Sequence, residues 1–263
     1  MKYSWIYFMS NRMEKLVAPK YTGEERVRKL RSMLKLSNDS IFYSVVTILA
    51  YVFFRNEYWF PSMVGGCGSC EKIYKDYPNW PDNTRYKLEI YFMLQLGVHF
   101  FSLFEMVVIK RKTELKFYEI VLHHSVAVSL ILFSCMSNQI TSGAMTLIIH
   151  DASDILMAFT RFYVETAGAS KLFSNISAAS MTIVWIWMRI IAFPYCILAN
   201  VYMNRPTEKD DWNMISFEYN YLLAMAIVLY GMHLFWTFFI IKISLKSIGK
   251  KSIENIHDKK EKM

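Results

Sequence analysis

The chain contains little charge and few cysteines for its length of 263 residues. Charged residues make up 20% of it, whereas hydrophobic residues make up 54%. The four cysteines include a single Cys-x-x-Cys pair, Cys67 and Cys70, so a tetrahedral zinc site built from two such pairs is excluded. A local disulfide or two free thiols are the alternatives for this pair.

The first ten residues lack the layout of a cleavable signal peptide, because aromatic and polar residues are mixed there. We therefore expect the first apolar run to act as its own insertion signal. The net charge of +8 could suit nucleic-acid binding, but basic loops in so apolar a chain are more typical of a membrane protein's cytoplasmic face. Nucleic acid is not expected as a partner.

Apolar runs of about 20 residues, enough to cross ~30 Å of hydrocarbon, recur along the chain. The expected spans are residues 41–60, 88–109, 117–136, 140–160, 172–200 and 217–243. The first ends in an aromatic belt, Tyr58-Trp59-Phe60, and the fifth is expected to be one long helix kinked near Pro194. These runs predict an all-α polytopic membrane protein with about six transmembrane helices.

The distribution of charge predicts the domain limits and the orientation. Residues 1–36 form a basic N-terminal segment, residues 37–246 the transmembrane domain, and residues 247–263 a charged tail. With six spans, 22 of the 30 Lys and Arg residues lie on the side of the two termini. Both termini are therefore expected to face the cytoplasm.

Ionisable residues concentrate at one depth of the third and fourth spans. The third contains His123 and His124, and the fourth contains His150-Asp151-Ala152-Ser153-Asp154. Only Ser137–Gln139 separates the two spans, so they form an antiparallel hairpin that brings these residues to a similar depth. An ionisable group at mid-membrane costs at least ~2.5 kcal/mol and normally faces a cavity or a partner.

Two explanations of this cluster stay open. A carboxylate beside an imidazole fixes its tautomer and raises its basicity, which suits a general base or a nucleophile. The same residues could instead form hydrogen bonds that only hold the two spans together. A third use is metal binding: the six histidines are too few for a membrane di-iron site, whereas a single-metal site with His99 and His233 is possible. The number of ionisable residues at one depth favours a functional site without metal.

The third and fourth spans resemble the signature motif of the ceramide synthases, which belong to the broader TLC-domain membrane family. The double His and the His-Asp-x-Ser-Asp sequence are its most specific part. The matching residues are Phe117, Tyr118, Glu119, His123, His124, Ser134, Asn138, Gly143, His150, Asp151, Ser153, Asp154 and Tyr163. The resemblance covers about residues 40–245 and implies a TLC-type bundle that encloses a lipid cavity.

The resemblance implies an N-acyltransferase that joins a fatty acyl-CoA to a sphingoid base to give ceramide, with no further cofactor. It implies His123, His124, Asp151 and Asp154 as catalytic residues. The substrate-binding candidates are His150, Ser153, Arg189, His233, Arg111 and Lys112. Arg111 and Lys112 could meet the phosphates of CoA or could serve only to set the topology. Arg189 could pair with a substrate oxygen or with a carboxylate.

The resemblance also implies an endoplasmic reticulum membrane protein that is surrounded by lipid and is compatible with a homo- or hetero-oligomer. The main alternative is a non-catalytic TLC-domain protein that binds or senses lipid or assists another membrane protein. A third alternative is a proton-coupled transporter, which would use intramembrane Asp and His as relays. Transporters commonly contain inverted repeats or broken helices, and neither is evident here.

Overall fold

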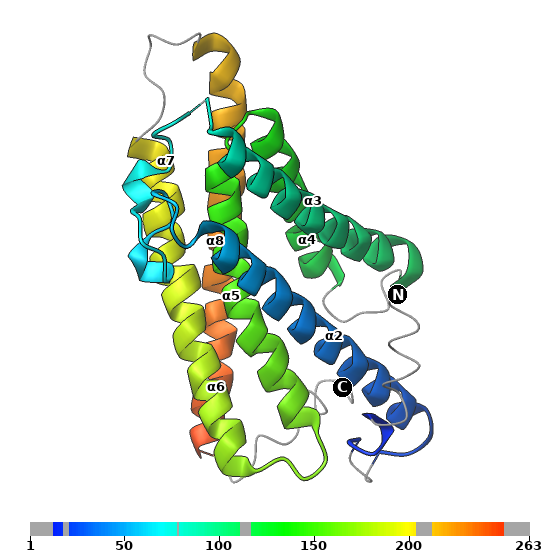
Figure 1. The fold of residues 1–263 in the computed structure, drawn as a ribbon. Helices are drawn as coiled ribbons and strands as arrows, with labels where there is room; N and C mark the ends of the chain where they lie inside the picture. Colours follow the sequence, from blue (N-terminus) through cyan, green and yellow to red (C-terminus); the bar gives the residue numbers. More distant parts are fainter. Residues whose placement is uncertain (1–12, 18–20, 78, 111–116, 204–211, 250–263) are drawn as a thin grey trace. The chain divides into compact units, whose positions relative to one another are not determined.

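The computed structural model describes residues 13–17, 21–77, 79–110, 117–203 and 212–249, and most of them are helical (Figure 1). The long helices are α2 (Gly23–Phe54), α3 (Asp82–Phe104), α4 (Phe117–Met136), α5 (Ile140–Glu165), α6 (Lys171–Trp185) and α8 (Trp212–Gly249). Two 3-10 turns, η1 (Ser62–Val64) and η2 (Cys70–Lys72), lie between α2 and α3. The π-helical segments are η3 (Glu105–Lys110), which follows α3, and η4 (Ile186–Ala192) and η5 (Pro194–Ala199), which lead from α6 to α7 (Asn200–Met203).

Among the described residues, five helical segments are long and apolar enough to cross a membrane. They are Gly23–Phe54, Asp82–Val108, Phe117–Met136, Lys171–Met203 and Phe217–Ser244. These segments confirm the prediction of an all-α polytopic membrane protein. Helix α5 has 26 residues, which is also sufficient length, but it contains polar and ionisable residues, so its crossing as a sixth span stays a prediction.

The outer faces of these helices are apolar. On α2, Val45, Ile48 and Val52 follow a helical spacing and are 58–71% exposed. On α8, Leu234 and Phe238 are likewise exposed. Exposed apolar side chains in rows along a helix suit contact with lipid rather than with water.

The first predicted span has different limits in the structure. Helix α2 begins at Gly23, inside the predicted N-terminal segment, because Glu24 and Glu25 in its first turn favour a helix start. Trp59 and Phe60 lie after the helix and are fully buried in a hydrophobic core, so the predicted aromatic belt is wrong at these two residues. The expectation of one long fifth helix is confirmed, since Lys171–Met203 is a single helical segment.

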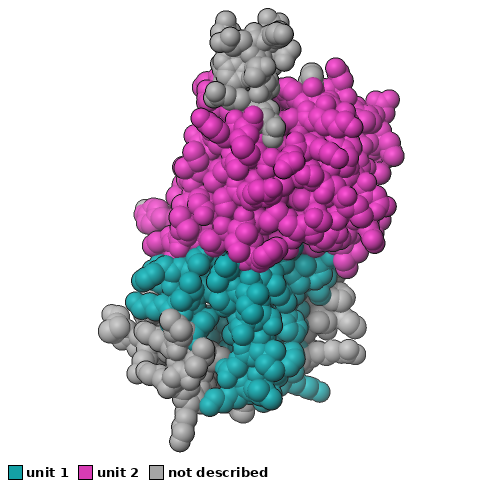
Figure 2. Space-filling model, turned by 90° about the vertical axis from the view of Figure 1, so that its left-hand side faces the viewer, with its two compact units in different colours: residues 1–45, 151–186, 237–263 teal, residues 46–150, 187–236 magenta. Residues whose placement is uncertain are grey.

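The chain divides into two compact units (Figure 2). Unit 1 comprises Met1–Val45, Asp151–Ile186 and Thr237–Met263, and unit 2 comprises Val46–His150 and Trp187–Trp236. In unit 1, hydrogen bonds between helices join α6 to α5 and to α8. The Thr160 Oγ1 and Ser177 Oγ atoms are 2.7 Å apart, and Trp185 Nε1 donates to Thr237 Oγ1 at 2.8 Å. Such bonds hold helices together where apolar association contributes little.

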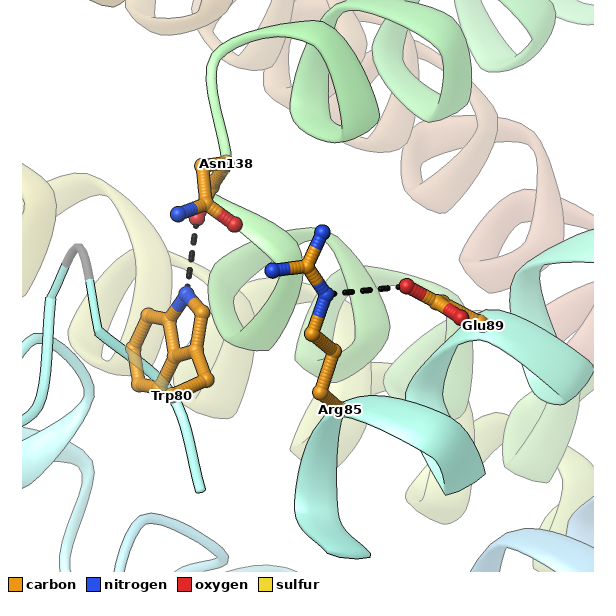
Figure 3. A network of polar contacts seen from close by, with 4 residues as sticks. All are labelled: Trp80, Arg85, Glu89 and Asn138. Carbon is orange, nitrogen blue, oxygen red and sulfur yellow. Dashed lines mark hydrogen bonds and ion pairs between the residues drawn. The ribbon is translucent and has the colours of Figure 1, made fainter. Parts of the chain in front are cut away.

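In unit 2, the loop between α2 and α3 binds the turn between α4 and α5. Trp80 Nε1 donates to the Asn138 carbonyl at 3.0 Å (Figure 3), and Tyr74 Oη donates to Gln139 Oε1 at 3.0 Å. Thr141 Oγ1 donates to the Ile73 carbonyl at 2.7 Å. Asn138 has a φ of 57°, a left-handed conformation that reverses the chain within three residues. The predicted short turn between the third and fourth spans is confirmed.

The hairpin of α4 and α5 packs closely because Gly143 has no side chain. A Cβ atom at this position would lie 2.7 Å from Ser134 Oγ on α4 and 2.8 Å from the Phe92 ring on α3. Small residues at helix contacts in membranes allow this close approach. Gly143 therefore permits the packing of three helices.

The two cysteines of the Cys-x-x-Cys pair lie in different surroundings. Both are free thiols; Cys67 is exposed, whereas Cys70 is buried. Of the two alternatives for the pair, the structure contains free thiols.

We predict that Trp80→Phe lowers the melting temperature in detergent. The change removes the indole N–H and leaves the Asn138 carbonyl without this donor, a cost of about 1–3 kcal/mol. Arg85→Gln is the matched control, since the Arg85–Glu89 ion pair in Figure 3 is 55% exposed at both side chains and contributes little. Equal melting temperatures for the two variants would contradict the role assigned to Trp80.

We also predict that Gly143→Ala destabilises the protein, whereas Gly97→Ala does not. The added methyl group at residue 143 would overlap Ser134 and Phe92, and overpacking of this kind costs about 1–3 kcal/mol. At Gly97, on helix α3, a Cβ meets nothing within 4 Å, so alanine should be neutral or stabilising. Thermal unfolding of both variants checks the difference, and its absence would show that α4 can move away.

Candidate active site

Five histidines lie in unit 2, on four of its helices. His99 is on α3, His123 and His124 are on α4, His150 is on α5, and His233 is on α8. Their ring contacts divide them into two groups: His150 with His233, and His99 with His123 and His124. Because α3 and α4 pack against each other, the second group spans their contact.

His150 and His233 form a direct hydrogen bond between their rings. Their Nε2 atoms are 2.8 Å apart, and His150 Nδ1 lies 2.6 Å from the Thr146 carbonyl. A carbonyl oxygen can only accept, so His150 Nδ1 carries a proton. With both rings neutral, His150 Nε2 is then the acceptor and His233 Nε2–H is the donor. This pair fixes the tautomers of both rings.

The surroundings of this pair are buried and include the guanidinium group of Arg189. His150 is 8% exposed, and His233 and Phe193 are fully buried. Phe193 meets both imidazoles edge to face, with ring centroids 5.5 Å from His150 and 5.1 Å from His233. Arg189, on η4 and 2% exposed, donates from a terminal guanidinium nitrogen to the His150 carbonyl at 3.3 Å. Arg189 therefore contacts the backbone that carries His150, a partner that the sequence did not suggest.

The second group brings three imidazoles together. The ring centroids of His123 and His124 are 5.4 Å apart, and those of His124 and His99 are 5.8 Å apart. The Trp236 ring, on α8, meets His123 edge to face at 5.2 Å. In the part of the chain that the structure describes, the Nδ1 atoms of His99 and His123 are buried and have no hydrogen-bond partner. Buried polar atoms of this kind are uncommon in native proteins and often mark a functional site.

Three predicted site residues, Asp151, Ser153 and Asp154, follow His150 on helix α5. Asp151 and Ser153 are 1% exposed, and Asp154 is 9% exposed. These three residues belong to unit 1, whereas the histidines belong to unit 2. The pairing of Asp151 or Asp154 with His123 or His124 therefore stays a prediction.

Two predicted residues, Arg111 and Lys112, lie outside the described residues. Their proposed contact with CoA phosphates stays a prediction. Within the described ranges, no three or more His, Cys, Asp or Glu side chains are arranged to share a metal ion.

His99 belongs to the second group of rings although the sequence suggested it only as a possible metal ligand. The available signal was an ionisable residue inside an apolar span, which is itself indicative of function. His233, which the sequence did place at the site, contacts His150 as well as Phe193. The arrangement can supply buried imidazoles for proton transfer or nucleophilic attack.

Comparison with known proteins places this site in a family. Residues 36–242 match the model of the TLC domain. The chain belongs to the TLC-domain family. The match includes α3, α4, α5 and the described part of α8 as far as residue 242, and therefore all five histidines of the two ring groups.

Similar proteins include several that are named as ceramide synthases, which confirms the resemblance of the sequence motif. Ceramide synthase 3 of Homo sapiens is 25% identical over 241 residues, covering 91% of this chain and 58% of the human protein. Ceramide synthase LOH1 of Arabidopsis thaliana is 26% identical over 227 residues, covering 84% of this chain and 69% of the plant protein. Ceramide synthase hyl-2 of Caenorhabditis elegans is 23% identical and covers 68% of this chain. The chain spans a little over half the length of the first of these relatives.

We predict that His233→Phe lowers the melting temperature and that His233→Gln restores part of the loss. Phenylalanine keeps a ring of similar size but leaves His150 Nε2 without a donor, at a cost of about 1–3 kcal/mol. Glutamine retains an N–H group that can reach the same acceptor. Thermal unfolding in detergent checks the order of the three proteins. A His233→Phe variant as stable as the wild type would show that the ring pair does not contribute to folding.

Proposed function

We propose that this protein is a ceramide synthase: an N-acyltransferase that joins the acyl group of a fatty acyl-CoA to the amine of a sphingoid base. The observation that carries the proposal is the ring group of His99, His123 and His124, in which the buried Nδ1 atoms of His99 and His123 have no hydrogen-bond partner among the described residues. Membership of the TLC-domain family and similarity to ceramide synthases support the same reaction.

In this reaction one imidazole of α4 acts as a base or as a nucleophile. As a base, His123 or His124 takes a proton from the amine as its nitrogen attacks the thioester carbonyl. The C–N bond forms, the C–S bond breaks, and the CoA thiolate leaves and takes up a proton. In the covalent alternative, the imidazole first accepts the acyl group and releases CoA, and the amine then attacks the acyl-imidazole.

The remaining predicted residues have supporting roles in the proposal. Asp151 or Asp154 would orient the reactive imidazole and stabilise its charged form. His150 and His233 would keep the neighbouring helix positions fixed through their hydrogen bond, and Arg189 or Ser153 would offer a donor to a substrate oxygen. Arg111 and Lys112 would bind the phosphates of CoA at the cytoplasmic mouth of the site.

The proposal includes a location and an orientation. The protein would lie in the endoplasmic reticulum membrane with both termini in the cytoplasm, where acyl-CoA is present. Membrane lipids would surround the apolar faces of α2 and α8, and the expected lipid cavity would hold the acyl chain. Association with a second copy or a relative is compatible with this arrangement.

The test is the turnover of the purified protein and of four variants with acyl-CoA and a sphingoid base. The variants are His123→Ala, His124→Ala, Asp151→Asn and Asp154→Asn. Where the replaced residue takes part directly in the chemistry, we expect turnover to fall by about 10²–10⁴-fold. The melting temperature of each variant separates lost chemistry from lost packing. Gly97→Ala is the control, because its surroundings are open.

Three outcomes separate the alternatives. Folded variants that all keep wild-type turnover would remove the proposed site, and activity lost only in step with stability would favour a structural role. A wild-type protein that binds these lipids without turnover would indicate the non-catalytic alternative. Intact mass after exposure to acyl-CoA alone distinguishes the two mechanisms, since only the nucleophilic route leaves an acyl adduct.

A further inference from the structure

His99 contributes a buried and unused hydrogen-bonding atom beside the double histidine. Its ring centroid is 5.8 Å from that of His124, which in turn is 5.4 Å from that of His123. The Nδ1 atoms of His99 and His123 are both buried without a hydrogen-bond partner among the described residues. Two such nitrogens, on two different helices, therefore flank one imidazole.

A single unpaired nitrogen could result from imperfect packing, but two within one ring group indicate a ligand with two polar atoms. A neutral imidazole has one donor and one acceptor nitrogen, so each Nδ1 can form one hydrogen bond in either tautomer. The Trp236 ring meets His123 edge to face at 5.2 Å, so it offers an apolar contact and not a hydrogen bond at this point.

We propose that His99 binds a hydroxyl group of the amine substrate, next to the amine whose acylation the double histidine of α4 catalyses. This inference rests on the proposed function. A sphingoid base is a 2-amino alcohol, so its amine and its hydroxyl groups lie on adjacent carbon atoms and can meet two adjacent imidazoles. A hydroxyl can donate or accept, and it therefore satisfies His99 Nδ1 in both tautomers, whereas an ammonium group can only donate.

His99 is accordingly a determinant of substrate specificity. A site that hydrogen bonds a substrate hydroxyl rejects an analogue that lacks it, because the buried protein group is then left unpaired. An amine without the neighbouring hydroxyl should still reach the double histidine, but it should bind less well. Loss of this hydroxyl should raise the KM for the amine more than the KM for acyl-CoA.

The experiment compares two long-chain amines of equal chain length, a 2-amino alcohol and its analogue without the adjacent hydroxyl. We expect the wild-type protein to prefer the amino alcohol by about 10-fold or more in kcat/KM. His99→Phe, which keeps a ring but has no nitrogen, should reduce this preference to within about 2-fold. His99→Asn, whose amide can occupy the place of Nδ1, should recover part of it. Gly97→Ala on the same helix should keep the wild-type preference.

A His99→Phe variant that is active and retains the wild-type preference would overturn the inference. A measurement on the wild type alone covers the case in which His99→Phe does not fold. Without acyl-CoA, the amino alcohol should raise the melting temperature more than its analogue does at the same concentration. Equal shifts would then overturn the inference. A wild type with no N-acylation of either amine would instead refute the proposed function, so the two failures are distinguishable.

Discussion

His150 satisfies three hydrogen-bonding demands at once in a buried part of unit 2. Its Nδ1 binds the Thr146 carbonyl, its Nε2 binds His233, and its own carbonyl accepts from Arg189. Helices α5 and α8 and the η4 segment therefore meet at this residue. Apolar association contributes little within a bilayer, so buried polar contacts and close packing must hold such helices together. The position of the surrounding side chains depends on this junction.

The loop between α2 and α3 has a corresponding role at the turn of the hairpin. Trp80, Tyr74 and the Ile73 carbonyl bind residues 138–141, where α4 ends and α5 begins. Fixing the turn fixes the register of α4 against the first half of α5. The depth of the double histidine relative to His150 follows from that register, so a loop distant from the rings contributes to their arrangement.

The two groups of imidazoles are suited to different roles, one structural and one in binding or reaction. His150 and His233 bind each other and are closed in by Phe193, which makes them a rigid structural pair. His99 and His123 instead have buried nitrogens that no described residue occupies. A site for catalysis needs both features: reactive groups with free hydrogen-bonding capacity, and a supporting structure that holds them in place. Both groups lie within the residues that match the TLC domain.

The apolar runs alone determined the membrane class, and the three-residue turn at Ser137–Gln139 alone determined that α4 and α5 form a hairpin. Sequence also pointed to His233 but could not tell that it binds His150, and it gave His99 no role beyond a possible metal ligand. The burial of Trp59 was likewise unpredictable, since an aromatic residue after a span suits the membrane interface equally well. Hydrophobicity along a helix sets the depth of each residue in the membrane, whereas the rotation of that helix about its axis is decided only by packing against its neighbours.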